Sequence, residues 1–305
     1  MALNPSTLKP SILKPSALKY RKSLFCKSIV ALALASLMPA AAHAHRPWLL
    51  PSSSNVDGKD PWVTIDTGIS ENLFDVDNTG MKLDGLVITG PDGATLQPDA
   101  TFVGHQRTSI DLKLAKPGTY KISIAGESVM ASYKLNGEPK RFRGTTEAFA
   151  KEVPADAQEL QKSITFSRNE TFVTTGEPNT TVLKPSNIGL EMIPITHPTQ
   201  LFAGEKASFR FLIDGKPAAK LGLSLIPGGV RYRGVLNEIR LVTHDKGEAS
   251  LIWPAAGMYW MTAAWPERTP GMEGQGPGQG PGEGKGQAQP ARRLAYSATL
   301  EVLPQ

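Results

Sequence analysis

The side chains best suited to chemistry in this sequence are its five histidines: His43, His45, His105, His197 and His244. Imidazole is the commonest metal ligand in proteins. The only cysteine is Cys26, close to the start of the chain. If the region around Cys26 is removed on export, no thiolate site, disulfide or cysteine nucleophile remains. Imidazole sites for copper, nickel, zinc or iron then remain as the metal chemistry to consider.

The first 44 residues have the three-part order of a secretory signal. Residues 1–27 carry six Lys or Arg and no Asp or Glu, an apolar run follows from Ile29 to Met38, and small residues fill Pro39–Ala44. The apolar run has about half of the 20 residues that span a bilayer, which argues against a membrane anchor. We therefore expect a cleaved signal at 1–44 and a mature protein in the periplasm.

The charge of the mature chain differs from that of the whole sequence. The sequence holds 33 Lys and Arg against 28 Asp and Glu, and residues 1–44 contribute six of the basic residues and none of the acidic ones. The remaining 27 basic and 28 acidic residues nearly balance. This balance gives no reason to expect a nucleic-acid partner or a polybasic membrane patch.

His45 becomes the first residue if cleavage follows Ala44. Its α-amino group and its imidazole then form a chelating pair on one residue, and the amine loses its proton readily because its pKa lies near 7.7–8.0. If cleavage follows Ala42, the chain starts His43-Ala44-His45, and a histidine at position three with a free amine binds copper(II) or nickel(II). Both starts favour the same metals.

The other histidines have ordinary structural roles available to them. We keep His105, at the expected start of a strand, as a second candidate metal ligand beside His45. His197 lies in a Pro-rich connector, where it could cap a turn or line a cleft, and His244 precedes Asp245 in a turn where backbone bonding is usual. No catalytic or phosphate-loop motif is found, so no catalytic residue is assigned.

Two further groups of residues could bind ligands. Glu71, Asp75, Asp77 and Asn78 form an oxygen-rich stretch, but their spacing is not that of a calcium loop. Arg231 and Arg233 alternate with a tyrosine, which on a strand would place both guanidinium groups on one face, able to bind an anionic chelate or simply solvated.

Short alternating segments between Gly, Pro, Asn and Asp predict an all-β protein. Segments such as 61–66, 109–114, 207–213 and 294–302 alternate apolar and polar residues at the spacing of a β-sandwich. A short helix is expected within 148–161. We predict two tandem immunoglobulin-like β-sandwich domains at residues 45–185 and 186–305.

Residues 271–291 consist mainly of Gly, Pro, Gln and Glu and cannot bury a core. They lie between two predicted strands of the second domain. We interpret them as a long disordered loop.

The sequence also resembles a known bacterial family over nearly the whole mature chain. The segments that carry the likeness are 45–51, 189–194, 201–205, 214–217, 228–233 and 253–260. The family is a domain-of-unknown-function family of the periplasm, often labelled as a component of cobalt or nickel uptake. The resemblance implies a metal ion or metal chelate as ligand and a metal-uptake transporter or outer-membrane receptor system as partner. It implies no catalytic residue.

The expected function is therefore a non-enzymatic periplasmic accessory to transition-metal or metal-chelate uptake. A structural or carbohydrate-contacting sandwich module without metal is an alternative, since the fold hosts such roles. A copper enzyme with an N-terminal histidine site is a second alternative, and it would need another histidine beside His45.

Overall fold

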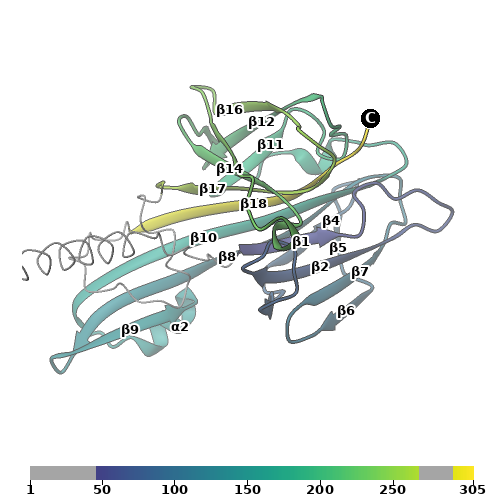
Figure 1. Ribbon diagram of the computed structural model, residues 1–305. Helices are drawn as coiled ribbons and strands as arrows, with labels where there is room; N and C mark the ends of the chain where they lie inside the picture. The colour runs from purple at the N-terminus through teal and green to yellow at the C-terminus, as the bar shows by residue number, and fades with distance from the viewer. Residues whose placement is uncertain (1–45, 268–290) are drawn as a thin grey trace, which may run out of the picture. The chain divides into compact units, whose positions relative to one another are not determined.

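The computed structural model describes residues 46–267 and 291–305. Within these residues the regular elements are almost all β-strands, which form three sheets that we call A, B and C (Figure 1). The prediction of an all-β sandwich fold is confirmed.

Sheet A has the strand order β1-β2-β7-β6, and β3 pairs with the far end of β2. Its strands are β1 (Arg46–Pro51), β2 (Trp62–Ser70), β3 (Thr79–Gly80), β6 (Ala100–Val103) and β7 (Thr108–Lys113). The sequence pattern explains the sheet, because Val63 and Ile65 of β2 are buried while Thr64 between them is exposed.

Sheet B is the largest and has the order β15-β14-β17-β18-β10-β8-β4-β5, with β9 paired to β8. Its strands are β4 (Leu86–Thr89), β5 (Thr95–Leu96), β8 (Gly118–Leu135), β9 (Glu138–Gly144), β10 (Gln158–Thr175), β14 (Gly222–Pro227), β15 (Ile239–Val242), β17 (Gly257–Trp265) and β18 (Arg292–Val302). The pairing of β10 with β18 is parallel, and the other pairs of this sheet are antiparallel.

Sheet C consists of β11 (Leu190–Pro194), β12 (Lys206–Ile213), β13 (Lys216–Pro217) and β16 (Glu248–Ile252). The predicted hairpin turn at Asp214-Gly215 joins β12 to β13. Both turn residues have positive φ, 49° and 77°, which is the backbone conformation that Asp-Gly turns favour.

Two hydrophobic cores lie on opposite faces of sheet B. Strand β10 serves both, because Phe172 packs into one core and its neighbour Val173 into the other. The core between sheets A and B contains, among others, Leu49, Ile65, Ile110, Tyr120 and Ile122. The core between sheets B and C contains, among others, Leu190, Phe209, Phe211, Trp253, Met261 and Tyr296.

The two cores correspond roughly to the two predicted domains, but sheet B is common to both. Strands β4, β5, β8, β9 and β10 precede the expected boundary at 185/186, and β14, β15, β17 and β18 follow it. All the described residues belong to one compact unit. The division into two domains stays a prediction, because each part has its own core while the hydrogen-bonded sheet is continuous.

The helices are short. They are α2 (Thr146–Glu152), the 3-10 helix η1 (Thr181–Leu183) and α3 (Val230–Arg233). The short helix expected within 148–161 is α2, which begins where the Thr145 hydroxyl accepts a hydrogen bond from the Ala148 amide. The C-terminal part of the expected range belongs instead to strand β10, which begins at Gln158.

The Arg231-Tyr232-Arg233 segment is not a strand, so that prediction is wrong. It forms the single helical turn α3, which lies between Gly229 and Gly234, both with left-handed backbone conformations. Arg233 donates hydrogen bonds to four carbonyl groups of the surrounding loop, whereas Arg231 is exposed and lies 3.9 Å from Asp75. The two guanidinium groups therefore do not form a common anion-binding face.

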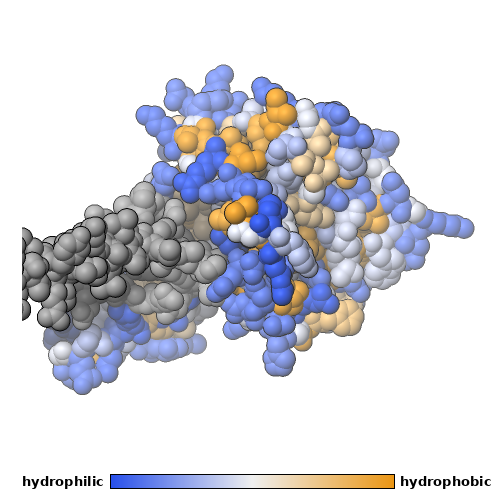
Figure 2. Space-filling view, in the orientation of Figure 1, coloured by the Kyte–Doolittle hydropathy of each residue, from blue (hydrophilic) through white to orange (hydrophobic). Residues whose placement is uncertain are grey.

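Polar residues dominate the visible surface, with separate hydrophobic areas between them (Figure 2). Scattered exposure of this kind is normal for folded proteins. No helix among the described residues is long and apolar enough to cross a membrane. The predicted loop at 271–291 lies outside the described residues except for its last position.

Candidate functional site

The three described histidines lie in different surroundings. His105 is exposed in the turn between β6 and β7, and its backbone carbonyl accepts a hydrogen bond from Gly80. His244 is in a turn, where its Nδ1 accepts a hydrogen bond from the Lys246 amide, as the sequence predicts. No group of three or more His, Cys, Asp or Glu side chains within 46–267 and 291–305 is arranged to hold a metal ion.

His197 has hydrogen-bond partners at both ring nitrogens. Its Nε2 lies 3.0 Å from the Asn179 carbonyl oxygen and 3.2 Å from the Thr119 hydroxyl, and its Nδ1 lies 3.1 Å from the Thr199 hydroxyl. Burial lowers the pKa of this imidazole. These contacts indicate that His197 joins three chain segments, which is a structural role.

The predicted metal residues His45 and His43 lie outside the described residues, but the strand that follows them is described. Arg46 pairs with Ser70 across β1 and β2, and its guanidinium donates to the Glu71 carbonyl at 2.7 Å. The Trp260 indole donates to the Pro47 carbonyl at 2.9 Å. The first residues of β1 are therefore held from both sheet A and sheet B.

Trp48 fixes the same strand from within. Its ring is 1% exposed, its indole nitrogen donates to the Ser70 hydroxyl at 2.8 Å, and it packs edge-on against Phe74. The ring lies directly over Gly68, where a Cβ atom would come within 2.5 Å of it. A glycine is needed at position 68 because no side chain fits beneath the tryptophan.

The oxygen-rich stretch at 71–78 is a braced loop rather than a calcium site. The Asp77 carboxylate accepts hydrogen bonds from the Glu71 and Asn72 amides and from the Asn72 side chain. Asp75 differs, because its buried Oδ2 has no hydrogen-bond partner among the described residues and its nearest cation is Arg231.

A second group of polar side chains that the sequence does not predict lies on strand β10. Arg168, Glu170 and Phe172 occur at every second position, so their side chains lie on the same face of sheet B, which strand β11 of sheet C covers. Arg168 is 8% exposed and Glu170 is 3% exposed. Glu191 of β11 is also 3% exposed, which places three buried charges close together.

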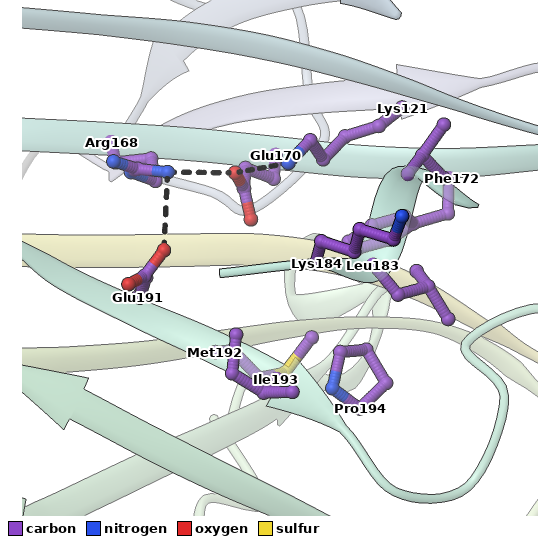
Figure 3. A pocket seen from close by; sticks show the side chains of 11 residues that line it. Lys121, Arg168, Glu170, Phe172, Leu183, Lys184, Glu191, Met192, Ile193 and Pro194 are labelled. Atoms are coloured by element: carbon purple, nitrogen blue, oxygen red, sulfur yellow. Dashed lines mark ion pairs between the residues drawn. The ribbon is translucent and has the colours of Figure 1, made fainter. Parts of the chain in front are cut away.

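These charges form an ion-pair cluster (Figure 3). Arg168 Nη1 lies 3.5 Å from Glu170 Oε1 and 3.8 Å from Glu191 Oε2, and Lys121 Nζ of β8 lies 4.0 Å from Glu170 Oε1. The second oxygen of Glu170 accepts a hydrogen bond from the Tyr296 hydroxyl at 3.0 Å. Burial and the Glu170 charge raise the pKa of the Tyr296 phenol, so that the phenol stays protonated and can donate.

Glu191 is fully bonded, but Glu170 and Arg168 are not. The Glu191 carboxylate accepts from the Ser186 amide and hydroxyl and from the Asn187 amide. Glu170 Oε1 and Arg168 Nε, in contrast, are buried without a hydrogen-bond partner among the described residues. Leaving such a buried group unmatched costs about 1–3 kcal/mol each, and more for charged groups.

The cluster lines a shallow pocket whose enclosed space is about 10 Å³, roughly what one water molecule needs. Phe172, Leu183, Met192 and Pro194 contribute apolar walls, and Lys184 adds a third cation. Lys184 is exposed and has no ion-pair partner among the residues that the structure describes. The pocket therefore presents positive charge beside an apolar wall, and its enclosed space has room for about one water molecule.

Little in the sequence could have revealed this pocket. Arg168, Asn169 and Glu170 are polar, which is typical of an exposed segment. They are buried because β10 lies in the middle of sheet B, paired with β8 and β18, and because other strands, such as β11 of sheet C, pack on its faces. A polar strand stretch directly before the apolar Phe172-Val173 was the only available signal.

The fold and these sites define an all-β sandwich protein. A comparison with family models assigns the chain to a family. The model described as "Domain of unknown function (DUF4198)" matches residues 42–267, about three quarters of the chain. The chain belongs to this family, as the sequence resemblance indicated. No curated protein matches the sequence.

Solved structures with some likeness are remote. A trypsin-activated alpha-2-macroglobulin from Escherichia coli is 13% identical, with a TM-score of 0.21, over 73% of this chain and 14% of that one. The D1–D4 ectodomain fragment of ICAM-5 is 12% identical, with a TM-score of 0.19, over 85% of this chain and 51% of that one. The chain thus spans about half or less of these proteins, and the scores carry no functional argument.

Proposed function

We propose that this protein is a non-enzymatic periplasmic accessory of transition-metal or metal-chelate uptake that binds metal through the amine and imidazole of an N-terminal His45. The resemblance to a family often labelled as part of cobalt or nickel uptake supports the class of ligand. The signal-like order of residues 1–44 supports export and the exposure of a free amine at His45.

The observation that carries the proposal is the anchoring of β1. Arg46 and Pro47, the two residues after His45, are hydrogen-bonded to Glu71 and Trp260, and Trp48 is buried. A metal ligand bonded to a fixed backbone loses less conformational entropy on binding than one on a free tail. The anchoring of β1 therefore supports metal binding by a chelating residue directly before it.

The available donor atoms limit the choice of metal. A mature chain starting at His45 has no cysteine, so nitrogen and oxygen ligands remain. Such sites follow the usual affinity order, in which nickel(II) and copper(II) bind more tightly than cobalt(II) or iron(II), and copper(II) more tightly than zinc(II). The amine and the imidazole must both lose protons, so binding weakens as the pH falls from about 8 to 6.

Titration calorimetry of the chelator-treated processed protein tests the proposal. Copper(II) or nickel(II) is expected to bind more tightly than zinc(II), and His45→Ala is expected to remove most of this affinity. His244→Ala is the matched control, because it also removes one imidazole but from an exposed turn between β15 and β16. Equal affinity of the His45→Ala variant and the unmodified protein would contradict the proposal.

The export part of the proposal has its own test. The intact mass of protein recovered from the periplasm is expected to correspond to a chain that begins at His45, or at His43. A protein that retains residues 1–40 would show that no free amine is available next to either histidine.

A further inference from the structure

Strand β6 forms an open edge of sheet A. It pairs with β7 on one side, and no other strand of the described residues pairs with it. Its side chains Phe102 and Val103 are 59% and 80% exposed. The strand lies at the outer edge of its sheet, and a hydrophobic area of the surface lies at the same place (Figures 1 and 2). The outward backbone groups of such an edge can pair with a strand from another chain.

The edge strand β9 of sheet B is protected in a way that β6 is not. Among the described strands β9 pairs with β8 alone, and its sequence contains Pro139, Lys140, Arg141 and Arg143. Proline and charged side chains are common means by which proteins block pairing at a sheet edge. Strand β6, with the sequence Ala-Thr-Phe-Val, contains neither. This contrast favours β6 as the edge at which another strand is added.

The hydrogen bonds of the β6–β7 hairpin determine which groups a new strand would meet. The Gly104 amide donates to the Arg107 carbonyl at 2.9 Å. Because the bonding direction alternates along an antiparallel strand, the amide and carbonyl of Phe102 also point toward β7. Those of Thr101 and Val103 therefore point outward. A strand added at this edge bonds to Thr101 and Val103 and places its own residue close to Phe102 in a non-hydrogen-bonded pair.

The sequence of β6 is complementary to itself in an antiparallel arrangement. Two β6 strands paired about Phe102 set the two phenylalanines against each other and Thr101 opposite Val103 of the second copy. Aromatic and β-branched cross-strand pairs of this kind stabilise sheets. Asp99 precedes the strand and His105 follows it, and both are exposed. Antiparallel pairing brings the carboxylate of one copy toward the imidazole of the other, whereas parallel pairing brings like groups together.

We propose that β6 pairs with β6 of a second copy of this chain and forms a symmetric dimer. Sheet A of one copy then continues into sheet A of the other, and the same surface serves both copies. The contact comprises about four backbone hydrogen bonds and the two phenylalanine rings. A contact of this extent belongs to the small class of interfaces, so the two copies associate reversibly with protein concentration. The dimer does not rest on the proposed function.

Disulfide trapping tests both the contact and its register. The protein that begins at His45 contains no cysteine. Opposed residues of a non-hydrogen-bonded pair have Cα atoms about 4.5 Å apart, within the range that a disulfide needs. Phe102→Cys is therefore expected to form a disulfide-linked dimer in a glutathione redox buffer. Val103→Cys is the register control, because Val103 faces Thr101 of the second copy, and it is expected to link at least tenfold more slowly.

Sedimentation velocity of the unmodified protein over a hundredfold range of concentration measures the association itself. A shift from monomer to dimer is expected as the concentration rises. Phe102→Lys places two like charges opposite each other and is expected to weaken the dimer at least tenfold. Val242→Lys is the matched control, because Val242 is 66% exposed on the edge strand β15 of sheet B, and it is expected to have no effect.

Three results would overturn the proposal. A monomer at every concentration would show that β6 does not pair with itself and is open to a strand of a different protein. Equal rates of linking for Phe102→Cys and Val103→Cys would show that the copies do not meet in the proposed register. An unchanged dimer in Phe102→Lys would place the contact between copies elsewhere on the molecule.

Discussion

Removal of the Arg168 charge is expected to destabilise the fold severely. Arg168 lies within 3.8 Å of both Glu170 and Glu191, and both carboxylates are 3% exposed. Arg168→Met keeps much of the side-chain volume but leaves two buried carboxylates with Lys121 as the remaining cation near Glu170. Removing one partner of a buried ion pair costs about 3–5 kcal/mol, because the other charge stays buried and uncompensated.

A loss of this size is a large part of the total stability, which is about 5–15 kcal/mol for typical proteins. Arg168 Nη2 also donates to the Ser186 hydroxyl and the Ile188 carbonyl, at 2.9 and 3.0 Å, so the segment before β11 loses two hydrogen bonds as well. In thermal unfolding, Tm is expected to fall by about 2–4 °C for each kcal/mol of stability lost.

Urea unfolding followed by circular dichroism measures the effect. The control is Arg210→Met, because Arg210 also pairs with a glutamate, Glu248, but on the exposed face of sheet C. Exposed pairs contribute little to stability, so the control is expected to unfold close to the unmodified protein. Equal losses of stability in the two variants, or no loss in Arg168→Met, would show that burial of the ion-pair cluster on β10 does not make the Arg168 charge important for stability.

Three further predictions concern other parts of the fold. Trp260→Phe removes the indole donor to the Pro47 carbonyl and is expected to cost about 1 kcal/mol and to speed hydrogen exchange of the β1 amides; unchanged exchange would mean that Trp260 does not hold the strand. Arg292 lowers the pKa of Asp214 to about 2 from 3.8, so this pair stabilises the fold above about pH 4 and its contribution is lost as the pH falls toward 2; the stability gap between the unmodified protein and Asp214→Asn, measured by urea unfolding, should close over this range. Burial lowers the pKa of His197 below 6.5, so the neutral imidazole contributes stability above pH 6.5, and this contribution is lost as the pH falls. Between pH 7.5 and 5.5, His197→Gln should therefore lose less stability than the unmodified protein. Parallel plots of unfolding free energy against pH for the two proteins would contradict this.

Much of the strand pattern is predictable from the sequence, because alternation of apolar and polar residues reports burial on one face. The segments 207–213 and 294–302 became β12 and β18 almost residue for residue. Turn residues with special backbone geometry, such as Asp214-Gly215, were equally informative. Both patterns depend only on residues close together in the sequence, so they can be recognised when the rest of the fold is unknown.

The features that the sequence did not predict depend mainly on contacts between segments that lie far apart in the chain. Strand β10 begins with Gln158 and Glu159, which favour helices, and the strand form of this first part is imposed by pairing with β8. The 231–233 segment alternates as a strand would, but flanking glycines with positive φ turn it into helix α3. The buried cluster on β10 requires knowledge of which strands pair, and no local pattern contains that information.

The role of His45 as an N-terminal metal ligand is tested most directly by moving the amine. The measurement is the nickel(II) or copper(II) affinity, by competition with a chelator at pH 7.5, of a protein that begins at His45 and of one with a single extra alanine before it. Both proteins keep all described residues and the His45 imidazole, so they differ in the position of the amine. We expect the extended protein to bind at least tenfold more weakly, because the amine no longer chelates together with the imidazole of the same residue. Equal affinities would show that the amine of His45 is not a ligand and would contradict an N-terminal metal site in this protein.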